Sequence, residues 1–467
     1  MLLAILLASI QLLSRQIPFA AAADPAFFDL TPELEQIDVQ AYCLDPNADR
    51  TPVFECYEVI SNKDPDQSIA VTHESGVRIH TTTFAIDSVS KYRFTPTLPG
   101  RWVGPDGMVL TASDIRPTYA AGFVKAKGAF WARSATGAVF APQYVMYYDS
   151  DIEGGIDEFI RGHGFTGFHI ANLRDFLVNP AFFEAVVIQT YRAGGVTHFW
   201  LWGDEQRGQT PNSYSGDVET LYRAIGARLG PLPGWTVGFG FDLYEWADDA
   251  AVDNFRLALE ATSSYRHLIG ARGNKNRYEE VYPDADFASW EWHRPTLHDY
   301  HQHVERARGR PAFSEDRFRI RTATRYPEKD YDEDLTRRGM WESLVAGGVA
   351  NIWGNQDSTG RFSRAYKNRE QLLLFRDTVD RYLSADMTQS LITDKGQACL
   401  VGDESVLCYG SDTRRLRLPE QISGRIQSAW LLDTITGEET AVSLEGLSKP
   451  EVVAPSLGDW ALVGALD

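Results

Sequence analysis

Hydrophobic residues fall into short alternating runs near both ends of the chain. Between residues 24 and 136, runs such as SIAVTHE, VRIHTTTFAI and KYRFTP are separated by turn sequences such as NKDPD and GPDG. After residue 388 the same rhythm returns in ACLVGD, SVLCYGS and SAWLLDT. Several short strands with frequent turns are typical of a β-sandwich. We therefore predict a small all-β domain over residues 24–136 and a second one over 388–467.

The middle of the chain has a different pattern, in which apolar strand-like runs alternate with longer helix-like runs. Several helix-like runs, such as GDVETLYRAIGARLG and DLTRRGMWESLVAGG, end at Gly, a common stop signal. This alternation predicts βα units around a parallel sheet. The predicted strands cover residues 139–148, 166–173, 197–204, 236–246, 267–273, 287–293, 310–316 and 349–355. Eight units over residues 137–387 match a (β/α)8 (TIM) barrel, which takes about 250 residues.

The first residues read MLLAILLASIQLLSRQIPFAAAADP. The apolar run is too short to span a bilayer, and small residues precede Asp24. We interpret residues 1–23 as a signal peptide, so that the protein is exported to the periplasm or the cell exterior. An uncleaved anchor is the alternative, because no basic residue precedes the apolar run. No later segment is apolar enough to span a membrane.

Composition indicates which classes of partner are excluded and whether the cysteines form disulfides. A net charge of -19 and a pI near 5.0 argue against nucleic acid or an anionic membrane surface as the main partner. The four cysteines form two sequence-local pairs, Cys43 with Cys56 and Cys399 with Cys408. In an exported protein we expect two disulfides, with four buried free thiols as the alternative.

Acidic residues close two of the predicted strands. The run WTVGFGFDLYEW carries Asp242 and Glu245, and the run RPAFSED carries Glu315. In a (β/α)8 barrel, the carboxyl ends of the strands meet at one face. Retaining glycosidases use two carboxyl groups about 5 Å apart, one as nucleophile and one as general acid/base. The pattern therefore predicts a carboxylate pair that cleaves glycosidic bonds.

The two acids have different sequence neighbours, which suggests different roles. Glu315 is followed by Arg317, Arg319 and Arg321, whose positive charge would keep a nucleophile ionised. We therefore assign Glu315 as the nucleophile and place Arg317 near the substrate.

Glu245 lies between Tyr244 and Trp246. Aromatic neighbours desolvate a carboxyl group and favour its protonated form, which suits a general acid/base. Asp242 is the competing choice for this role, or a structural acid that contacts substrate.

Further substrate-binding candidates lie on the predicted strands or at their ends: His169, Asn172, Asp204, Glu205, Trp290 and Trp353. Trp353 would stack on a sugar ring, with packing between strand and helix as the alternative. Because successive strand residues face opposite sides, about half of such positions must be structural.

Metal and cofactor signals are weak. The histidines 298, 301 and 303 lack an accompanying acid motif and are predicted to lie on a solvated helix face. The lone G-x-G at 238–240 falls inside a strand rather than opening a helix. We predict no metal and no cofactor.

Several phrases together resemble a known family. They are YRFTPTLPGRW and GFVKAKGAFWAR near the start, GFGFDLYEW, GRPAFSEDRFRIR and RRGMWESLVAGGVANIWG in the middle, and WLLDTITGEE and GDWALVGAL near the end. The chain resembles bacterial glycoside hydrolases of clan A type. Those proteins join an immunoglobulin-like domain, a (β/α)8 barrel and a C-terminal β-sandwich labelled collagen-binding.

The resemblance implies roles for individual positions. In that clan the acid/base closes strand four and the nucleophile closes strand seven, which corresponds to Glu245 and Glu315 here. An aromatic residue typically follows strand eight, where Trp353 stands. Clan members usually carry Asn before the strand-four Glu, whereas this chain has Tyr244, so Asp242 stays open as the acid/base. No collagen partner follows from the label.

The combined prediction is an exported, retaining glycoside hydrolase that acts on a poly- or oligosaccharide. A non-catalytic carbohydrate-binding surface protein on a barrel scaffold is one alternative. A transglycosylase that uses the same site is another.

Overall fold

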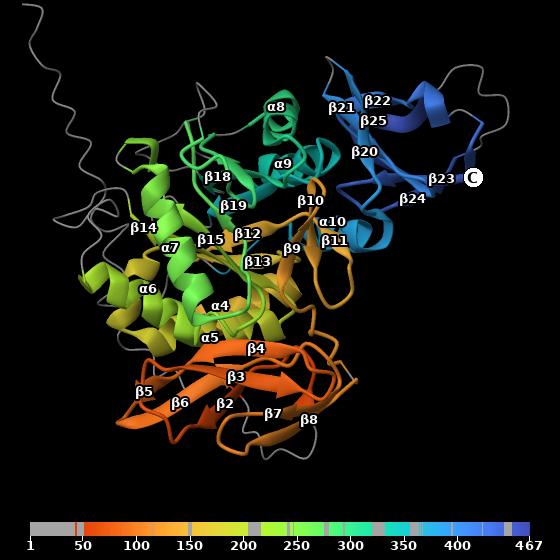
Figure 1. Cartoon of the computed structure of the whole chain (residues 1–467). Helices are drawn as coiled ribbons and strands as arrows, with labels where there is room; N and C mark the ends of the chain where they lie inside the picture. The colour runs from red at the N-terminus through yellow and green to blue at the C-terminus, as the bar shows by residue number, and fades with distance from the viewer. Residues whose placement is uncertain are drawn as a thin grey trace, which may run out of the picture. The chain divides into compact units, whose positions relative to one another are not determined.

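The computed structural model describes residues 43, 51–114, 116–147, 152–203, 216–240, 243–245, 247–274, 280–292, 295–319, 332–354, 364, 366, 368–393, 396–422, 424–442 and 451–467 (Figure 1). The predicted signal peptide, residues 1–23, lies outside these ranges.

Two sheets near the N-terminus share one hydrophobic core. One has the strand order β1 (Thr51–Pro52), β8 (Val109–Ser113), β7 (Gly100–Val103), β3 (Ser68–His73) and β4 (Arg78–Thr82). The other has the order β2 (Tyr57–Ile60), β6 (Val89–Phe94) and β5 (Phe84–Ile86). Trp102 and Val71 of the first sheet pack with Tyr92 and Phe94 of the second, all without exposed surface. The predicted all-β region is therefore present.

A small antiparallel sheet leads from this region into the barrel. It consists of β9 (Val124–Lys127), β10 (Phe130–Arg133) and β11 (Val139–Phe140). The ring of Trp131 on β10 lies 4.9 Å from the ring of Phe287 and 5.9 Å from that of Phe313. Both phenylalanines stand at the starts of barrel strands, so this sheet covers the N-terminal end of the barrel.

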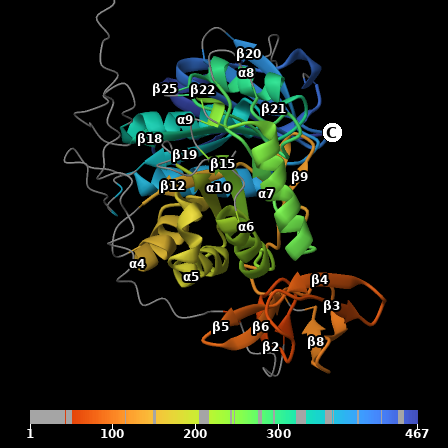
Figure 2. The same ribbon diagram turned by 60° about the vertical axis from the view of Figure 1, so that its left-hand side comes forward.

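Eight parallel strands form the barrel, as the sequence predicts (Figures 1 and 2). In chain order they are β12 (Gln143–Met146), β13 (Gly167–Ile170), β14 (Val196–Trp202), β15 (Trp235–Gly240), β16 (Ile269–Gly270), β17 (Ala288–Trp290), β18 (Ala312–Arg319) and β19 (Ala350–Gly354). The first strand begins at Gln143 rather than 139, because Val139 and Phe140 pair with β10 instead.

The barrel is nearly closed. Every neighbouring pair of strands is hydrogen-bonded except β16 and β17, which stand at the two edges of the sheet. A single bridge between Gly273 and Trp290 connects the chain just after β16 to the end of β17. We call this junction between the fifth and sixth strands the seam.

Helices cover the outside of the barrel, and Figure 2 shows α5, α6 and α7 following one another around the strands. Their bounds are α4 (Ile152–Asp157), the π-helix η1 (Glu158–Gly162), the 3-10 helix η2 (Leu173–Leu177), α5 (Pro180–Arg192), α6 (Gly216–Arg228), the 3-10 helix η3 (Leu243–Glu245), α7 (Asp249–Thr262), α8 (Leu297–Ala307), α9 (Glu333–Val345) and α10 (Arg369–Tyr382). Asp248 caps α7 and Thr296 forms a capping box with Asp299 on α8, which fixes where both helices begin. The described residues between β16 and β17 contain no helix.

Residues along the barrel strands alternate between the interior and the helices. Tyr144, His198 and Phe313 point inward, and their rings lie 4.7–5.7 Å apart. Phe199 and Phe239 point outward, where they meet Phe183 of α5 and Phe255 of α7. This alternation decides which strand side chains can reach a site inside the barrel.

The C-terminal residues form one six-stranded sheet with the order β20 (Thr388–Thr393), β21 (Gln397–Val401), β22 (Ser405–Arg417), β25 (Glu451–Leu466), β23 (Ile426–Asp433) and β24 (Glu439–Ala441). The pairing of β22 with β25 changes register between Gly410 and Arg415. Such irregularities bend strands, and side chains from both halves of β22 and β25 share one core. The second predicted all-β region is therefore also present.

One of the two predicted disulfides exists. Cys399 and Cys408 stand opposite each other on β21 and β22 and are bonded. The prediction for the other pair is wrong, because Cys43 and Cys56 are free thiols. Burial raises the pKa of the Cys56 thiol, and a hydrogen bond with Cys43 contributes to the same rise. The two thiols are therefore neighbours without a disulfide between them.

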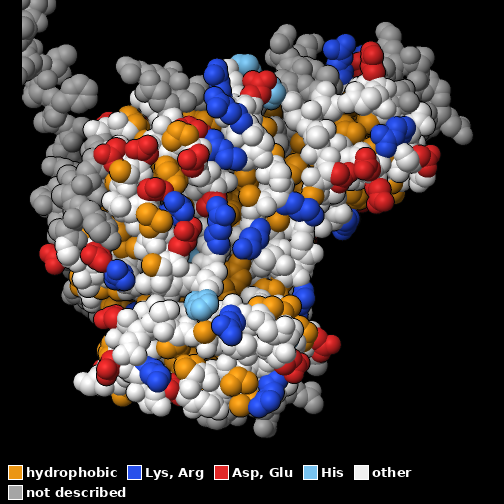
Figure 3. All heavy atoms as spheres, in the orientation of Figure 1, with side chains coloured by type: hydrophobic (Ala, Val, Ile, Leu, Met, Phe, Trp, Pro, Cys, Tyr) orange, Lys and Arg blue, Asp and Glu red, His pale blue; other side chains and the backbone are white. Residues whose placement is uncertain are grey.

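Charged residues connect the barrel helices to the flanking sheets. Arg93 of β6 is buried and pairs with Glu184 of α5 at 3.0 Å. Arg337 and Arg338 of α9 both pair with Asp459 of β25. Figure 3 shows acidic and basic side chains interspersed over the face that it draws. Within the described ranges, no helix has the length and apolar character needed to cross a membrane.

Candidate active site

Glu315 of β18 projects into the barrel interior and has no exposed surface. Trp200 donates a 2.7 Å hydrogen bond from Nε1 to Glu315 Oε1. His198 Nε2 lies 3.0 Å from the same oxygen. Ser289 donates from its hydroxyl to Oε2. Contacts on both oxygens fix the orientation of the carboxyl group.

Strand alternation brings these partners together. His198 and Trp200 are two residues apart on β14, and Ser289 lies on β17 next to β18. Gly238 of β15 completes the enclosure, because a Cβ at this position would lie 1.7 Å from Glu315 Oε1. Only glycine leaves room for the carboxyl group there.

The hydrogen bonds of His198 indicate which of its nitrogens faces Glu315 as a donor. Its Nδ1 lies 2.9 Å from Oγ1 of Thr236 on β15. If the threonine hydroxyl donates to Nδ1, then Nε2 carries the proton and donates to Glu315. The ring of His169 on β13 lies 4.4 Å from that of Trp200. His169 has no exposed surface, and its ring packs edge-on against Trp200, one of the donors to Glu315.

The main chain at Glu315 is irregular. The pairing of β18 with β19 shifts register between Ser314 and Arg317, which places Glu315 inside a bulge. The carbonyl oxygen of Glu315 accepts a 2.9 Å hydrogen bond from Nη1 of Arg272. Arg272 follows β16 and is buried.

Arg272 also contacts a second acid, Glu291, which the sequence did not identify as a site residue. Its Nη2 lies 3.7 Å from Oε2 of Glu291, which directly follows β17. Tyr244 donates a 2.9 Å hydrogen bond from its hydroxyl to the same oxygen. The signal for Glu291 is the alternation in FASWEWH, which puts it on the same side as Ser289.

Glu245 occupies the last position of η3, immediately after the fourth strand. Its side chain is exposed. The expectation that aromatic neighbours enclose it is therefore wrong. The 3-10 turn separates Glu245 from the strand, and the hydroxyl of neighbouring Tyr244 is bonded to Glu291 instead.

Two predicted substrate-binding residues face away from the barrel interior. Trp290 has no exposed surface, and its ring lies 5.4 Å from that of His303 on α8. Trp353 has none either, donates to Gln143 at 2.8 Å and packs beside Gly339 of α9. The substrate-binding assignments of Trp290 and Trp353 are wrong, because strand alternation points both side chains at helices.

The remaining predicted site residues divide into two groups. Asn172 follows β13 with a φ of 60°, a conformation that Asn tolerates better than most residues, and is buried. Asp204, Glu205 and Asp242 lie outside the described residues, and of Arg317 only the main chain is described.

The histidines of α8 do not all lie on a solvated face. His303 is fully buried and its pKa is lowered to about 3 by burial, so the prediction is wrong for this residue. Its place between the helix and Trp290 explains the burial. In the described part of the chain, no group of three or more His, Cys, Asp or Glu side chains could hold a metal ion.

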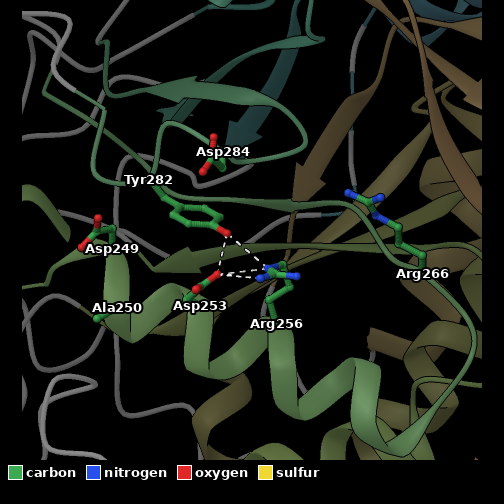
Figure 4. Close-up of a pocket in the computed structure, with 7 residues that line it drawn as sticks. All are labelled: Asp249, Ala250, Asp253, Arg256, Arg266, Tyr282 and Asp284. Atoms are coloured by element: carbon green, nitrogen blue, oxygen red, sulfur yellow. Dashed lines mark hydrogen bonds and ion pairs between the residues drawn. The ribbon is translucent and has the colours of Figure 1, made fainter.

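A separate cavity of about 500 Å³ lies beside α7, and Glu315 is not among its lining residues (Figure 4). It is lined by Asp249, Ala250, Asp253, Arg256, Arg266, Tyr282 and Asp284. Tyr282 and Arg256 both donate to Oδ1 of Asp253, at 2.8 Å each. These groups bind one another and tether the loop before β17 to α7.

Comparison with known proteins supports the architecture. No protein-family profile and no curated protein matches the chain. Among solved structures, a proposed glycoside hydrolase from Bacteroides vulgatus ATCC 8482 is similar over 90% of this chain and 100% of its own, with a TM-score of 0.66 and 14% identity. A glycoside hydrolase family 5 protein from the same organism is similar over 75% of this chain and 93% of its own, with a TM-score of 0.60 and 11% identity.

A further structure described as a glycoside hydrolase covers 75% of this chain and 98% of its own, with a TM-score of 0.59 and 11% identity. Identities this low establish the fold alone. The resemblance noted from the sequence is therefore confirmed at the level of architecture: the chain has a (β/α)8 barrel with all-β regions on both sides, a fold that it shares with these glycoside hydrolases.

Proposed function

We propose that the protein is a retaining glycoside hydrolase in which Glu315 is the nucleophile and Glu245 the general acid/base, with Asp242 as the alternative acid/base. The observation that carries this proposal is the setting of Glu315. It is an inward-facing acid on the seventh strand of a barrel shared with glycoside hydrolases, and Trp200 and Ser289 donate to its two oxygens. Such fixed donors orient a nucleophile before substrate arrives.

The reaction proceeds in two displacements. Oε2 of Glu315 uses a lone pair to form a bond with the anomeric carbon, while the bond to the leaving oxygen breaks and that oxygen takes a proton from the acid/base. Oε2 is the attacking atom because its partner is the hydroxyl of Ser289, which can rotate away. The same acid/base, now ionised, takes a proton from water, which attacks the anomeric carbon and releases Glu315.

A second candidate has its own supporting observation. Glu315 has no exposed surface, and its oxygens are bonded within the protein. A barrel that binds carbohydrate without cleaving it would use Glu315 only as a buried structural acid. This candidate predicts saturable binding of a polysaccharide with no products.

The test is a screen of polysaccharides and 4-nitrophenyl glycosides with wild-type protein beside Glu315→Gln. Glu342→Gln is the matched control, because Glu342 is a half-buried acid on the outer helix α9. We expect cleavage to fall by at least about 1,000-fold in Glu315→Gln and to be unchanged in the control. Equal cleavage by Glu315→Gln and wild type would show that the nucleophile is another residue.

We also propose that the protein is exported. The apolar leader and the Cys399–Cys408 disulfide support this, since disulfides persist mainly in oxidising compartments. N-terminal sequencing of protein recovered from the periplasm or the medium should begin near Asp24. Recovery of intact, reduced protein from the cytoplasm alone would contradict export.

A further inference from the structure

We propose that Tyr244, Glu291 and Arg272 form a positioning bridge that fixes the two catalytic segments relative to each other. The bridge runs from the loop after strand four, which carries Glu245, across the seam to the main chain of Glu315. None of its members reacts with substrate. The expected effect of the bridge on catalysis rests on the proposed function. Its expected effect on the position of Glu315 rests only on the contacts in the structure.

Arg272 acts on Glu315 in two ways. Its Nη1 donates to the Glu315 carbonyl within the bulge of β18, at a point where strand pairing with β19 is interrupted. Its guanidinium also lies 5.5 Å from the ring centre of Trp200, whose Nε1 donates to Glu315 Oε1. Arg272 therefore supports both the main chain and a side-chain donor of the nucleophile. Because this site is buried, the planar guanidinium of Arg, which is less strongly hydrated than a Lys ammonium, is the favoured cation there.

Glu291 holds Arg272 and connects it to Tyr244. Its Oε2 receives the Tyr244 hydroxyl at 2.9 Å and lies 3.7 Å from Arg272 Nη2. The side chain of Glu291 is 13% exposed, so its charge is only partly screened by water. Because Tyr244 immediately precedes Glu245, the bond to Glu291 sets the position of the η3 turn that carries the predicted acid/base.

The bridge lies where the barrel is weakest. β16 has only two residues, and β16 and β17 do not pair as strands. Main-chain hydrogen bonds through Gly273 and the contact of Arg272 with Glu291 connect the two sides at the mouth of the barrel. A movement at the seam would therefore change the separation of strands four and seven.

Loss of the bridge should lower kcat and leave KM nearly unchanged. Two-carboxylate catalysis needs a fixed separation of about 5 Å, and a displacement of 1 Å costs about 100-fold. We expect Tyr244→Phe, Glu291→Gln and Arg272→Lys each to lower kcat about 10- to 100-fold while KM changes less than about 3-fold. The substrate is the oligosaccharide that wild-type protein cleaves best, because its poor leaving group makes cleavage depend on both catalytic segments. Tyr244→Phe keeps the ring and removes only the hydroxyl.

A double-mutant cycle distinguishes a bridge from independent local damage. If Tyr244 and Glu291 act through one contact, Tyr244→Phe/Glu291→Gln should lose about as much kcat as Glu291→Gln alone. Additive losses, or losses confined to KM, would overturn the proposal. Thermal unfolding of each variant shows whether a loss of kcat comes from loss of fold.

A second readout does not need activity. In protein labelled with 5-fluorotryptophan, the 19F resonance of residue 200 is assigned by its disappearance in Trp200→Phe. We expect Arg272→Lys to move it most, followed by Glu291→Gln and then Tyr244→Phe. An unmoved resonance in all three variants of an active enzyme would overturn the bridge. Moved resonances in a protein without glycosidase activity would support the bridge and reject the proposed function.

Discussion

Glu315 and Glu245 look alike in sequence, because each follows an apolar run at a predicted strand end. In the structure their environments are opposite. Glu315 faces the barrel interior with no exposed surface and contacts from His198, Trp200 and Ser289. Glu245 is exposed on a 3-10 turn after the strand. The difference shows that aromatic neighbours in sequence do not enclose an acid, whereas strand alternation does.

The two acids are held in place in different ways. Glu315 is held by three strands and cannot move far without disturbing its donors. Glu245 depends on the position of its turn, which the Tyr244 hydroxyl ties to Glu291. Changes around Glu315 should therefore affect every substrate, while changes around Glu245 should depend on the leaving group.

Among changes that keep both acids, the largest effect is expected from Gly238→Ala. The added Cβ would lie 1.7 Å from Glu315 Oε1, so the carboxyl group must move. We expect kcat to fall at least about 100-fold and the free energy of unfolding to fall by about 1–3 kcal/mol. Steady-state kinetics and chemical denaturation measure both. Wild-type kinetics in a folded Gly238→Ala protein would show that the position of Glu315 does not matter.

Glu245→Gln should have a large effect only on substrates with poor leaving groups. Protonation of the leaving oxygen matters less when that group is already stable as an anion. We expect about a 100-fold loss on an oligosaccharide and a much smaller loss on a 4-nitrophenyl glycoside. Asp242→Asn is measured in parallel. If only Asp242→Asn shows this pattern, the acid/base is Asp242.

Trp353→Phe should reduce stability without changing activity. The indole donates to Gln143 and packs on α9, so the variant loses one buried hydrogen bond and some packing. We expect the free energy of unfolding to fall by about 1–2 kcal/mol, with kcat and KM unchanged. A rise in KM without a loss of stability would return Trp353 to the substrate site.

The last effect is expected at Glu342, where the change concerns stability alone and depends on pH. Burial raises the pKa of this carboxyl to about 7, above its value in the unfolded chain. The folded state then holds a proton that the unfolded state has lost, so stability falls as pH rises from about 4.5 to 7. Glu342→Gln should remove this fall and raise stability by about 2 kcal/mol at pH 8, with little change at pH 4. An equal difference in the free energy of unfolding between Glu342→Gln and wild type at pH 4 and pH 8 would contradict this prediction.

The repeating pattern of the chain was enough to predict the barrel. Eight apolar runs separated by helix-like runs gave all eight strands, and the flanking all-β regions followed from alternation and turns. Glu315 can be predicted from the sequence, because a single segment is enough to identify an acid at a strand end. Its partners His198, Trp200, Ser289 and Arg272 come from other strands, and their approach depends on register, which the sequence does not state.

The errors have separate physical origins. Residue type alone assigns Trp290 and Trp353 to the site, but the period of two along a strand points them toward α8 and α9. His303 was placed on a solvated face, although it packs beneath Trp290. Cys43 and Cys56 are close in sequence and space, yet proximity alone did not make a disulfide.

The most direct test of the account is to trap the glycosyl-enzyme. A 2-deoxy-2-fluoro glycoside, made from the sugar that wild-type protein cleaves best, should inactivate the protein with one label per chain. Peptide mass spectrometry should place that label on Glu315. A label on any other residue, or rapid turnover of natural substrate with inversion at the anomeric carbon and no covalent adduct, would contradict the account.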